Sequence, residues 1–282
     1  MGKSASGKYL KITVVTPCYN SGKYLEETIK SVVDQQYPNL EYIIIDGGSN
    51  DGSVAWIKKY ESAISYWTSE HDHGVYDALN KGFQKSSGEI MGWLNAGDIL
   101  MPKSLFFLNE LFIRHDNINW IQGQPLLLSD RGYVMHNSPH YGVEFDYLLK
   151  KYRTGYHFIQ QESTYWRRPL WEKAGGHLNS RLKLAGDFDL WMRFFQHANL
   201  LHTKGLIGAF RIHEGQLSEN ADAYFEECDQ VVDQLLQNTE NKNQLKAYRR
   251  WVRISRIPWV RKVIWNKMNT QRRRSYSIQF IQ

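Results

Sequence analysis

Hydrophobic and polar positions near the start of the chain predict a β–α–β unit. The β-branched run at residues 11–16 predicts a buried strand, and apolar residues at helical spacing over 21–36 predict an amphipathic helix. A second apolar run at 41–45 predicts another strand, parallel to the first, with a right-handed crossover. Ligands bind beyond the carboxyl ends of such strands, so residues 17–20 and 46–51 should share one crevice.

Short strands and amphipathic helices continue to alternate along the chain, with no internal repeat or low-complexity linker. This alternation predicts an α/β fold. The predicted helices lie at 53–60, 77–85, 101 onward with Pro102 in the first turn, 145–152 and 185–197, and the predicted strands at 64–67, 89–94, 120–122, 132–136 and 200–203.

The composition indicates a folded protein with two differently charged parts. The chain has 282 residues and is 42% hydrophobic, which is enough for a buried core and excludes a disordered or collagen-like chain. Its 14% aromatic content can supply stacking platforms for sugars or bases, or fill a large core. The net charge is +6, but all 29 acidic residues and 23 of the 35 basic residues precede residue 241. An acidic body therefore precedes a wholly basic tail of charge +12.

Cysteine usage and hydropathy bear on the location of the protein. Cys18 and Cys228 are too few for a disulfide framework, and no CxxC or metal-binding Cys/His cluster occurs, which favours a reducing, cytosolic setting. The polar N-terminus has no signal-like apolar run, and no later stretch approaches 18 uninterrupted apolar residues. We therefore expect neither secretion through a visible signal nor a membrane-spanning helix.

Polar clusters lie near the ends of several predicted strands. The glycine-rich loop 46–52 could let a ligand approach the backbone or be an ordinary turn, and it matches neither a dinucleotide fingerprint nor a phosphate loop. Asp98 follows the strand at 89–94 and could hold a divalent cation or cap the next helix. Residues 70–82 crowd carboxylates, an amide and a cation into 13 positions, which is unusual for a solvated loop.

Two further candidates lie toward the end of the acidic body. Asp187 and Asp189 are two positions apart on a predicted helix and point about 200° away from each other, so only one can face a pocket. Alternatively, both carboxylates simply lie at the positive end of the helix dipole, where a negative charge is stabilising. His213 could add an imidazole ligand to a metal held by Asp98, or be an ordinary surface or core histidine.

Taken together, these segments resemble the family 2 glycosyltransferases, which have the GT-A fold. The matching pieces occur in the family's order over roughly residues 9–218, and they look most like the branch that makes bacterial polysaccharide and lipopolysaccharide. The pieces are TPCYN at 16–20, IDGGSNDGS at 45–53, EHDHGVYDALNKG at 70–82, NAGD at 95–98 and RIH at 211–213.

The resemblance implies a domain layout and a reaction. A Rossmann-like mixed sheet flanked by helices would occupy residues 9–218, after a disordered tail at 1–8 and before a helical, basic C-terminal extension at 219–282. The protein would be a metal-dependent glycosyltransferase that moves a sugar from a nucleotide-sugar donor to a glycan or lipid-linked acceptor.

The resemblance also implies roles for individual residues. Asp98 matches the surviving carboxylate of the metal motif and would hold Mn²⁺ or Mg²⁺, with His213 as a further ligand, and Asp187 matches the catalytic base. An acceptor hydroxyl needs a base for its attack, and the metal stabilises the leaving nucleoside diphosphate, so one base and direct displacement predict inversion at the anomeric carbon. The residues implied to bind the nucleotide sugar are Pro17, Tyr19, Asn20, Asp46, Gly48, Ser49, Asp72, Lys81, Asn95 and Asp98.

Three glycines depart from the family pattern. Gly47 stands where many relatives have an Asp that contacts uracil, Gly97 replaces the first Asp of the metal pair, and Gly186 replaces the Glu of a Glu-Asp pair. The nucleobase of the donor therefore stays open. The same departures leave room for an alternative, a non-catalytic sugar-nucleotide-binding or scaffold protein with the same fold.

Residues 160–168 are also family-like and lie where an acceptor-facing loop is expected. Arg167 or Arg168 in this segment could meet a phosphate group. As an alternative, the two arginines could simply be solvated on the surface.

The basic tail needs an explanation of its own. Residues 245–268 are compatible with a helix, with apolar residues three to four apart, basic residues among them and a break at Pro258. Such a segment suits an interfacial helix on anionic lipid, which a lipid-linked acceptor would make useful. It could instead bind nucleic acid or pack on its own domain. We expect peripheral docking on the inner face of the cell membrane and no nucleic-acid partner.

Overall fold

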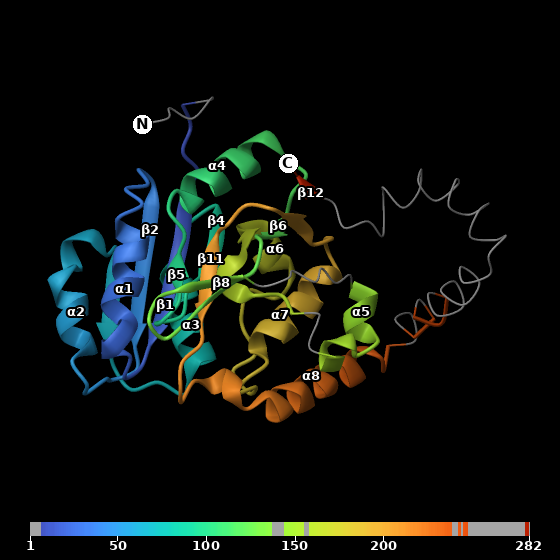
Figure 1. Ribbon diagram of the computed structural model, residues 1–282. Coiled ribbons are helices and arrows are strands. Elements are labelled where there is room, and N and C mark those ends of the chain that lie inside the picture. The colour runs from blue at the N-terminus through green and yellow to red at the C-terminus, as the bar shows by residue number, and fades with distance from the viewer. Residues whose placement is uncertain are drawn as a thin grey trace.

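The first part of the chain forms the predicted β–α–β unit (Figure 1). β1 (Ile12–Cys18) pairs in parallel with β2 (Leu40–Asp46), and α1 (Gly22–Val33) connects them. Every residue of β1 is buried, as expected for a β-branched strand inside a covered parallel sheet. The computed structural model describes residues 7–136, 144–154, 158–238, 242–243, 245–247 and 280–281.

The main sheet has eight described strands. In sheet order they are β12 (Phe280–Ile281), β10 (Leu201–Thr203), β6 (Trp120–Gln122), β9 (Thr164–Arg167), β4 (Ile90–Trp93), β1, β2 and β3 (Tyr66–Ser69). β9 runs antiparallel to β4 and β6, whereas the other pairs are parallel. The sheet is therefore mixed, as the resemblance implied, and its antiparallel strand β9 is a part that the hydrophobic pattern had not predicted.

Helices cover both faces of this sheet (Figure 1). One layer contains α1, α2 (Ser53–Lys59) and α4 (Ser104–Arg114). The opposite layer contains α3 (Val75–Lys85), α6 (Arg168–Lys173), α7 (Gly186–Phe195) and α8 (Ala221–Leu235).

Alternation along the strands divides the core between these layers. Val14 and Ile44 pack with the layer of α1, whereas Val15 and Ile45, one position further along each strand, pack with the layer of α3 and α7. Successive side chains of a strand point to opposite faces, so one apolar run supplies both cores.

An aromatic core lies between the sheet and α7. Trp93, Trp120, Trp166 and Trp191 are fully buried. The ring centroids of Trp93 and Trp120 lie 5.5 and 5.7 Å from that of Trp191 in stacked pairs. These tryptophans fill the core and are not open platforms for a sugar or a base.

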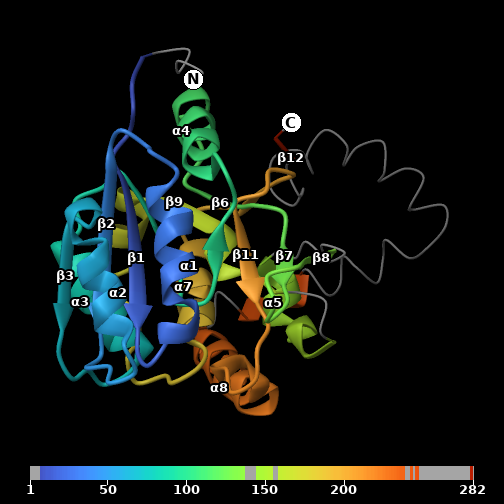
Figure 2. The same cartoon turned by 60° about the vertical axis from the view of Figure 1, so that its left-hand side comes forward.

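A smaller sheet lies beside the main one (Figure 2). Its order is β5 (Ile99–Leu100), β11 (Gly208–Arg211), β7 (Leu126–Leu128) and β8 (Val134–His136). β11 pairs with β5, which directly follows Asp98. This pairing brings the segment that ends at Arg211 against Asp98, although the two residues are far apart in the sequence.

Several predicted boundaries need correction. The strand expected at 64–67 begins at Tyr66, after a 3₁₀ turn at Glu61–Ala63. The helix expected from residue 101 begins at Ser104 because Lys103 adopts a left-handed conformation with φ of 66°, so Pro102 precedes the helix.

The helix expected at 145–152 is also interrupted. Lys150, with φ of 57°, separates α5 (Glu144–Leu148) from a 3₁₀ turn at Lys151–Thr154. Two further 3₁₀ turns, Gln161–Ser163 and Leu217–Glu219, precede β9 and α8.

The last long described helix, α8, is part of the packed body. Its Cys228, Val231 and Val232 are buried in the same core as α7. Most of the tail predicted at 1–8 and of the helix predicted at 245–268 lies outside the described residues. Within the described part of the chain, no helix is long and apolar enough to cross a membrane.

Candidate functional site

The loop after β2 is braced from within by Asp46, which is fully buried. Its Oδ2 accepts hydrogen bonds from the backbone N–H groups of Gly48 at 3.2 Å and Ser49 at 2.9 Å, and from the Ser69 hydroxyl at 2.6 Å. The Ser49 hydroxyl donates to Asp46 Oδ1 at 2.5 Å. Asp46 therefore fixes the backbone conformation of the loop at Gly48 and Ser49.

The loops after β1 and β2 lie against each other, as the parallel strands predict. Asn20 Oδ1 accepts from the backbone N–H of Asn50 at 3.0 Å, and the Asn20 N–H donates to the Ser49 hydroxyl at 2.7 Å. The Pro17 carbonyl accepts from Ala96 N–H at 3.4 Å, which joins the 95–98 turn to the same edge. Tyr19 is 64% exposed beside these loops and is therefore available to a ligand.

The segment after β3 reaches into the space beside Gly47. A Cβ added to Gly47 would lie 2.6 Å from Asp72 Oδ2, so the Asp72 carboxylate occupies the position of a side chain at residue 47. Asp72 Oδ1 accepts from Gly74 N–H at 2.9 Å. Lys81, from α3, lies 3.4 Å from the Asp77 carboxylate and 3.5 Å from that of Glu70, so neighbouring carboxylates balance its charge.

The same segment fills the space beside a second departing glycine. A Cβ added to Gly186 would lie 2.8 Å from the ring of Tyr76, which is buried and whose hydroxyl donates to the Leu184 carbonyl at 2.5 Å. Gly47 and Gly186 therefore give room to Asp72 and Tyr76. The glycine at position 97 is explained differently, because its φ of +123° lies in the region that favours glycine.

Asp98, the last residue of the 95–98 turn, is buried. Its Oδ1 accepts from the backbone N–H of Arg211 at 2.9 Å, and its Oδ2 accepts from Gln161 Nε2 at 3.3 Å. Burial raises the pKa of Asp98 to about 7, against the opposing effect of Arg211. A bound cation would favour the ionised form of this carboxylate.

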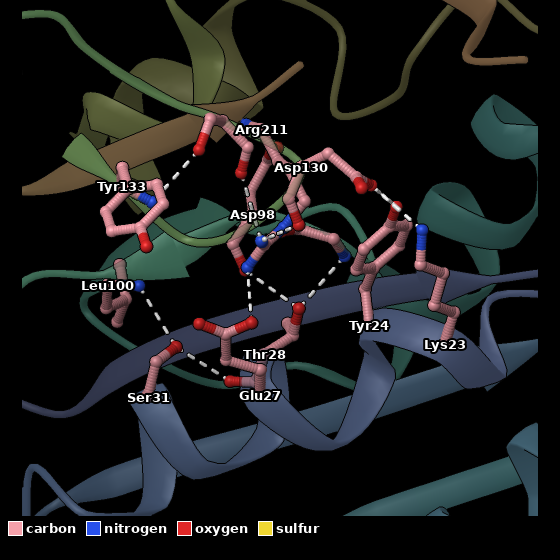
Figure 3. A network of polar contacts seen from close by, with 12 residues as sticks. Lys23, Tyr24, Glu27, Thr28, Ser31, Asp98, Leu100, Asp130, Tyr133 and Arg211 are labelled. Carbon is pink, nitrogen blue, oxygen red and sulfur yellow. Dashed lines mark hydrogen bonds and ion pairs between the residues drawn. The ribbon is translucent and has the colours of Figure 1, made fainter. Parts of the chain in front are cut away.

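Arg211 ties the turn to α1 (Figure 3). Its Nε donates to the Gly97 carbonyl at 2.7 Å, and its guanidinium pairs with Glu27. The Thr28 hydroxyl donates to the Asp98 carbonyl at 2.8 Å and accepts from Gly97 N–H at 2.9 Å. Two elements remote in sequence thus hold the backbone on which Asp98 is presented.

The residues around this turn fit a hard divalent cation. His213 Nδ1 lies 2.9 Å from the Glu214 carbonyl, which leaves Nε2 available, 3.9 Å from a Cβ built on Gly97. Asn95 Oδ1 is buried and has no hydrogen-bond partner among the described residues. Carboxylate, amide and imidazole ligands suit Mn²⁺, and the first two suit Mg²⁺. The described residues contain no cluster of three His, Cys, Asp or Glu ligands, so a donor diphosphate would have to complete the coordination.

Asp187 lies in the first turn of α7, where the helix dipole favours a negative charge. Its Oδ1 is buried and has no hydrogen-bond partner in the part of the chain that the structure describes, and its Oδ2 lies 3.5 Å from the Tyr224 hydroxyl. Burial raises the pKa of Asp187 to about 7, although nearby backbone N–H groups and the hydroxyls of Tyr224 and Tyr76 act in the opposite direction. Asp189 points elsewhere and pairs with Arg193 at 2.9 Å on its own helix.

Sequence reasoning had assigned no role to Glu162, which is buried beside Gln161. Burial and the nearby carboxylates of Asp98 and Asp187 raise its pKa well above the usual range. Glu162 is therefore within electrostatic reach of both predicted functional carboxylates. It lies in the 3₁₀ turn before β9, and the only signal for it in the sequence was its place within the family-like segment 160–168.

Two other expectations for this region are wrong. Arg167 donates to the carbonyls of Ile118 and Phe112 at 2.7 and 2.6 Å, and Arg168 donates to the Gly88 carbonyl at 2.8 Å. These arginines neither face a phosphate nor stay solvated. They satisfy backbone carbonyls that the fold leaves unpaired.

Comparison with known sequences gives a family match. Residues 13–172 match the family model described as Glycosyl transferase family 2. An uncharacterized glycosyltransferase of Rickettsia bellii (strain RML369-C) is 24% identical over 249 residues, which cover 84% of this chain and 35% of the relative. The chain thus spans about a third of that relative's length. TuaG of Bacillus subtilis (strain 168), a candidate teichuronic acid biosynthesis glycosyltransferase, is 34% identical over 90 residues, 31% of this chain and 36% of TuaG.

Solved structures share the fold at low sequence identity. Residues 1–349 of TarS from S. aureus in complex with UDP-GlcNAc superpose with a TM-score of 0.64 at 17% identity, covering 84% of this chain and 70% of that one. The mannosyltransferase PcManGT from Pyrobaculum calidifontis, in complex with GDP-Man and Mn²⁺, gives a TM-score of 0.56 at 13% identity, covering 93% and 85%. At these identities the likeness concerns the fold.

Proposed function

Because the chain belongs to glycosyltransferase family 2, we propose that it transfers a sugar from a nucleotide donor to a glycan or lipid-linked acceptor of the bacterial cell surface. One observation carries the proposal: the loops after β1 and β2 and the 95–98 turn, which presents the buried Asp98, meet at one edge of the sheet. A candidate metal ligand thus lies beside the loops proposed to hold the donor. The name of TuaG supports a surface glycan as the product.

In the proposed reaction Asp187 is the catalytic base. An acceptor hydroxyl has a very high pKa, so its attack on the anomeric carbon requires proton removal in the transition state. A carboxylate with a pKa of about 7 is matched to this task near neutral pH. Direct attack by the hydroxyl, with departure of the diphosphate from the opposite side, inverts the anomeric carbon.

The donor would lie across the edge formed by the loops after β1 and β2 and the 95–98 turn. Tyr19 can stack on a base, the backbone of Gly48 and Ser49 permits close approach, and Asp72 replaces a side chain at residue 47. Pro17, Asn20 and Asp46 shape the loops. Lys81 would contribute its cation near the diphosphate.

Asp98, His213 and Asn95 would hold Mn²⁺ or Mg²⁺ together with the diphosphate. The bound ion would neutralise the charge that develops on the leaving group. The Mn²⁺ in the PcManGT complex supports this choice of cofactor. Arg211 and Thr28 would keep the turn rigid when the ion binds.

The proposed catalytic unit extends beyond residue 218, because α8 contributes Tyr224 to the surroundings of Asp187. The basic segment that follows would dock on anionic lipid at the cytoplasmic face of the membrane. Replacement of the basic residues between 248 and 274 by glutamine, which keeps β12 in the chain, should lower binding to vesicles containing anionic lipid and leave donor binding nearly intact. Unchanged vesicle binding would contradict the docking proposal.

A donor panel tests the function. UDP-, GDP- and dTDP-sugars are added with Mn²⁺, and both the melting temperature and the release of nucleoside diphosphate are measured. We expect one nucleotide class to stabilise the chain and to be turned over, and EDTA to abolish turnover. Binding without turnover across donors and acceptors would instead support the sugar-nucleotide-binding alternative, and no binding at all would overturn the proposal.

A further inference from the structure

A carboxylate on α8 holds the turn that precedes Asp187. Glu227 accepts hydrogen bonds from three consecutive backbone N–H groups, those of Lys183 at 3.0 Å, Leu184 at 2.9 Å and Ala185 at 2.8 Å. Charge-assisted bonds of this kind are stronger than neutral ones. One side chain thus holds the backbone of the three residues that precede α7.

The start of α7 needs such a partner. Its N-cap residue, Ala185, has no side chain that can accept a hydrogen bond, and the first N–H groups of a helix have no partner within the helix. Of these groups Glu227 satisfies the N–H of Ala185 itself, and its other two hydrogen bonds hold the residues that lead into the helix. Its negative charge also lies at the positive end of the α7 dipole.

The same face of α8 touches the base directly. Tyr224, three residues before Glu227, has its hydroxyl 3.5 Å from Asp187 Oδ2. On the other side, Tyr76 donates to the Leu184 carbonyl at 2.5 Å. The turn is therefore held through its N–H groups by Glu227 and through a carbonyl by Tyr76.

We infer that Glu227 is a positioning residue, which sets the location of Asp187 through the 183–185 turn. The inference rests on the proposed function in one respect, that Asp187 is the base. A displacement of about 1 Å of a catalytic group can cost about 100-fold in rate, so a turn held by three hydrogen bonds matters to the chemistry. Glu227 lies outside residues 13–172, the part of the chain that the family model matches.

A second contact anchors α8 independently of Glu227. Asp229 accepts from the Tyr152 hydroxyl at 2.6 Å and from the Arg153 guanidinium at 2.6 and 3.1 Å. Replacement of Glu227 therefore leaves the helix attached to the body. The effect of such a variant should be confined to the turn.

The test compares Glu227→Gln with Glu226→Gln in the full chain. Both variants remove one negative charge from adjacent positions of α8, but Glu226 is exposed. Amide hydrogen exchange of residues 183–186 is measured by mass spectrometry, together with turnover of the panel donor that stabilises the chain most. We expect Glu227→Gln to speed this exchange by about tenfold and to lower kcat by about tenfold at unchanged donor KM, whereas Glu226→Gln leaves both unchanged.

A conservative variant separates positioning from general destabilisation. Glu227→Asp keeps the charge and should recover part of the lost kcat. Unchanged exchange at 183–186 in Glu227→Gln would overturn the inference, as would faster exchange with full turnover. If the wild-type chain turns over no donor, the proposed function fails, and the exchange data still decide whether Glu227 holds the turn.

Discussion

Candidate donor residues such as Pro17, Asp46 and Asp98 lie at or just beyond the end of a strand, whereas Asp187 is surrounded by side chains from distant segments. Asp46 is held by its own loop and the adjacent strand. Asp187 instead depends on Tyr224 and, through its turn, on Glu227 and Tyr76. On the donor side, the loops after β1 and β2 are thus built from local β–α geometry, whereas the base side, like Asp98 in its contacts with Arg211 and Gln161, depends on long-range packing.

Burial changes the pKa of individual carboxylates on the two sides to different extents. On the donor side, hydrogen bonds from Ser53 and Gly22 outweigh the raising effect of burial and lower the pKa of Asp51. On the base side, burial dominates and raises the pKa of Asp187 to about 7. Burial also raises the pKa of Asp98, on the donor side, to about 7, so the candidate base and the candidate metal ligand share a raised pKa.

The largest effect expected on either side comes from Asp187→Asn. The amide cannot accept the proton of the acceptor, and loss of a general base costs about 10²–10⁴-fold in rate. Sugar transfer is measured with the identified donor, and donor affinity by calorimetry. We expect transfer to be nearly abolished and affinity to stay within about twofold, because the donor crevice is built separately.

Asp189→Asn is the matched control for this variant. Asp189 lies two residues further along α7 and pairs with Arg193, away from Asp187. Its replacement should leave the transfer rate almost unchanged. If Asp187→Asn retains full transfer, or Asp189→Asn loses it, the base has been assigned to the wrong residue.

The difference in construction explains what the sequence could predict. Strands β1 and β2, the helix between them and the meeting of their loops follow from periodicity and strand direction. The roles of Tyr76 and Glu227 do not, because they depend on which distant backbone groups the fold leaves unpaired. Strand β9 was not predicted, because its short run resembles a loop. For the same reason, neither the burial of Glu162 next to this strand nor the structural role of Arg167 within it was predicted.

The next largest effect is a difference in stability between two glycine variants, Gly186→Ala on the base side and Gly47→Ala on the donor side. The new methyl group would meet the buried ring of Tyr76 at 2.8 Å in the first case and the end of the Asp72 side chain at 2.6 Å in the second. The ring is packed in the core and cannot move easily, whereas a partly exposed carboxylate can rotate away. Gly186→Ala should therefore cost about 1–3 kcal/mol of unfolding free energy, and Gly47→Ala clearly less.

Urea unfolding of both variants provides the measurement. Gly47→Ala should weaken donor binding, since Asp72 is displaced, while Gly186→Ala should lower turnover at unchanged donor affinity. Equal destabilisation by the two substitutions would mean that the donor side is packed as rigidly as the base side. The contrast between the sides would then be lost.

A smaller effect concerns pH. Below pH 7 the carboxyl of Asp187 is protonated and cannot act as a base, so turnover should fall by up to about tenfold per pH unit. Between pH 3.8 and about 7 the folded chain keeps a proton on this group that the unfolded chain releases, so this contribution to stability is lost as the pH rises. Turnover is followed from pH 5.5 to 8.5 at saturating donor and Mn²⁺, because burial also raises the pKa of Asp98 to about 7 and makes donor binding depend on pH. A pH-independent kcat would contradict the role of Asp187.

The smallest effect is expected from Asp229→Asn, which tests whether the two contacts of α8 are separable. Asp229 joins α8 to Tyr152 and Arg153, at a partly exposed site remote from the turn at 183–185. Loss of its charge should lower the free energy of unfolding by about 1 kcal/mol, because such pairs are screened by solvent. Turnover should change by less than about twofold, since Glu227 still holds the turn. A large loss of turnover in Asp229→Asn, measured beside urea unfolding, would mean that the base depends on the placement of the whole helix and not on Glu227 alone.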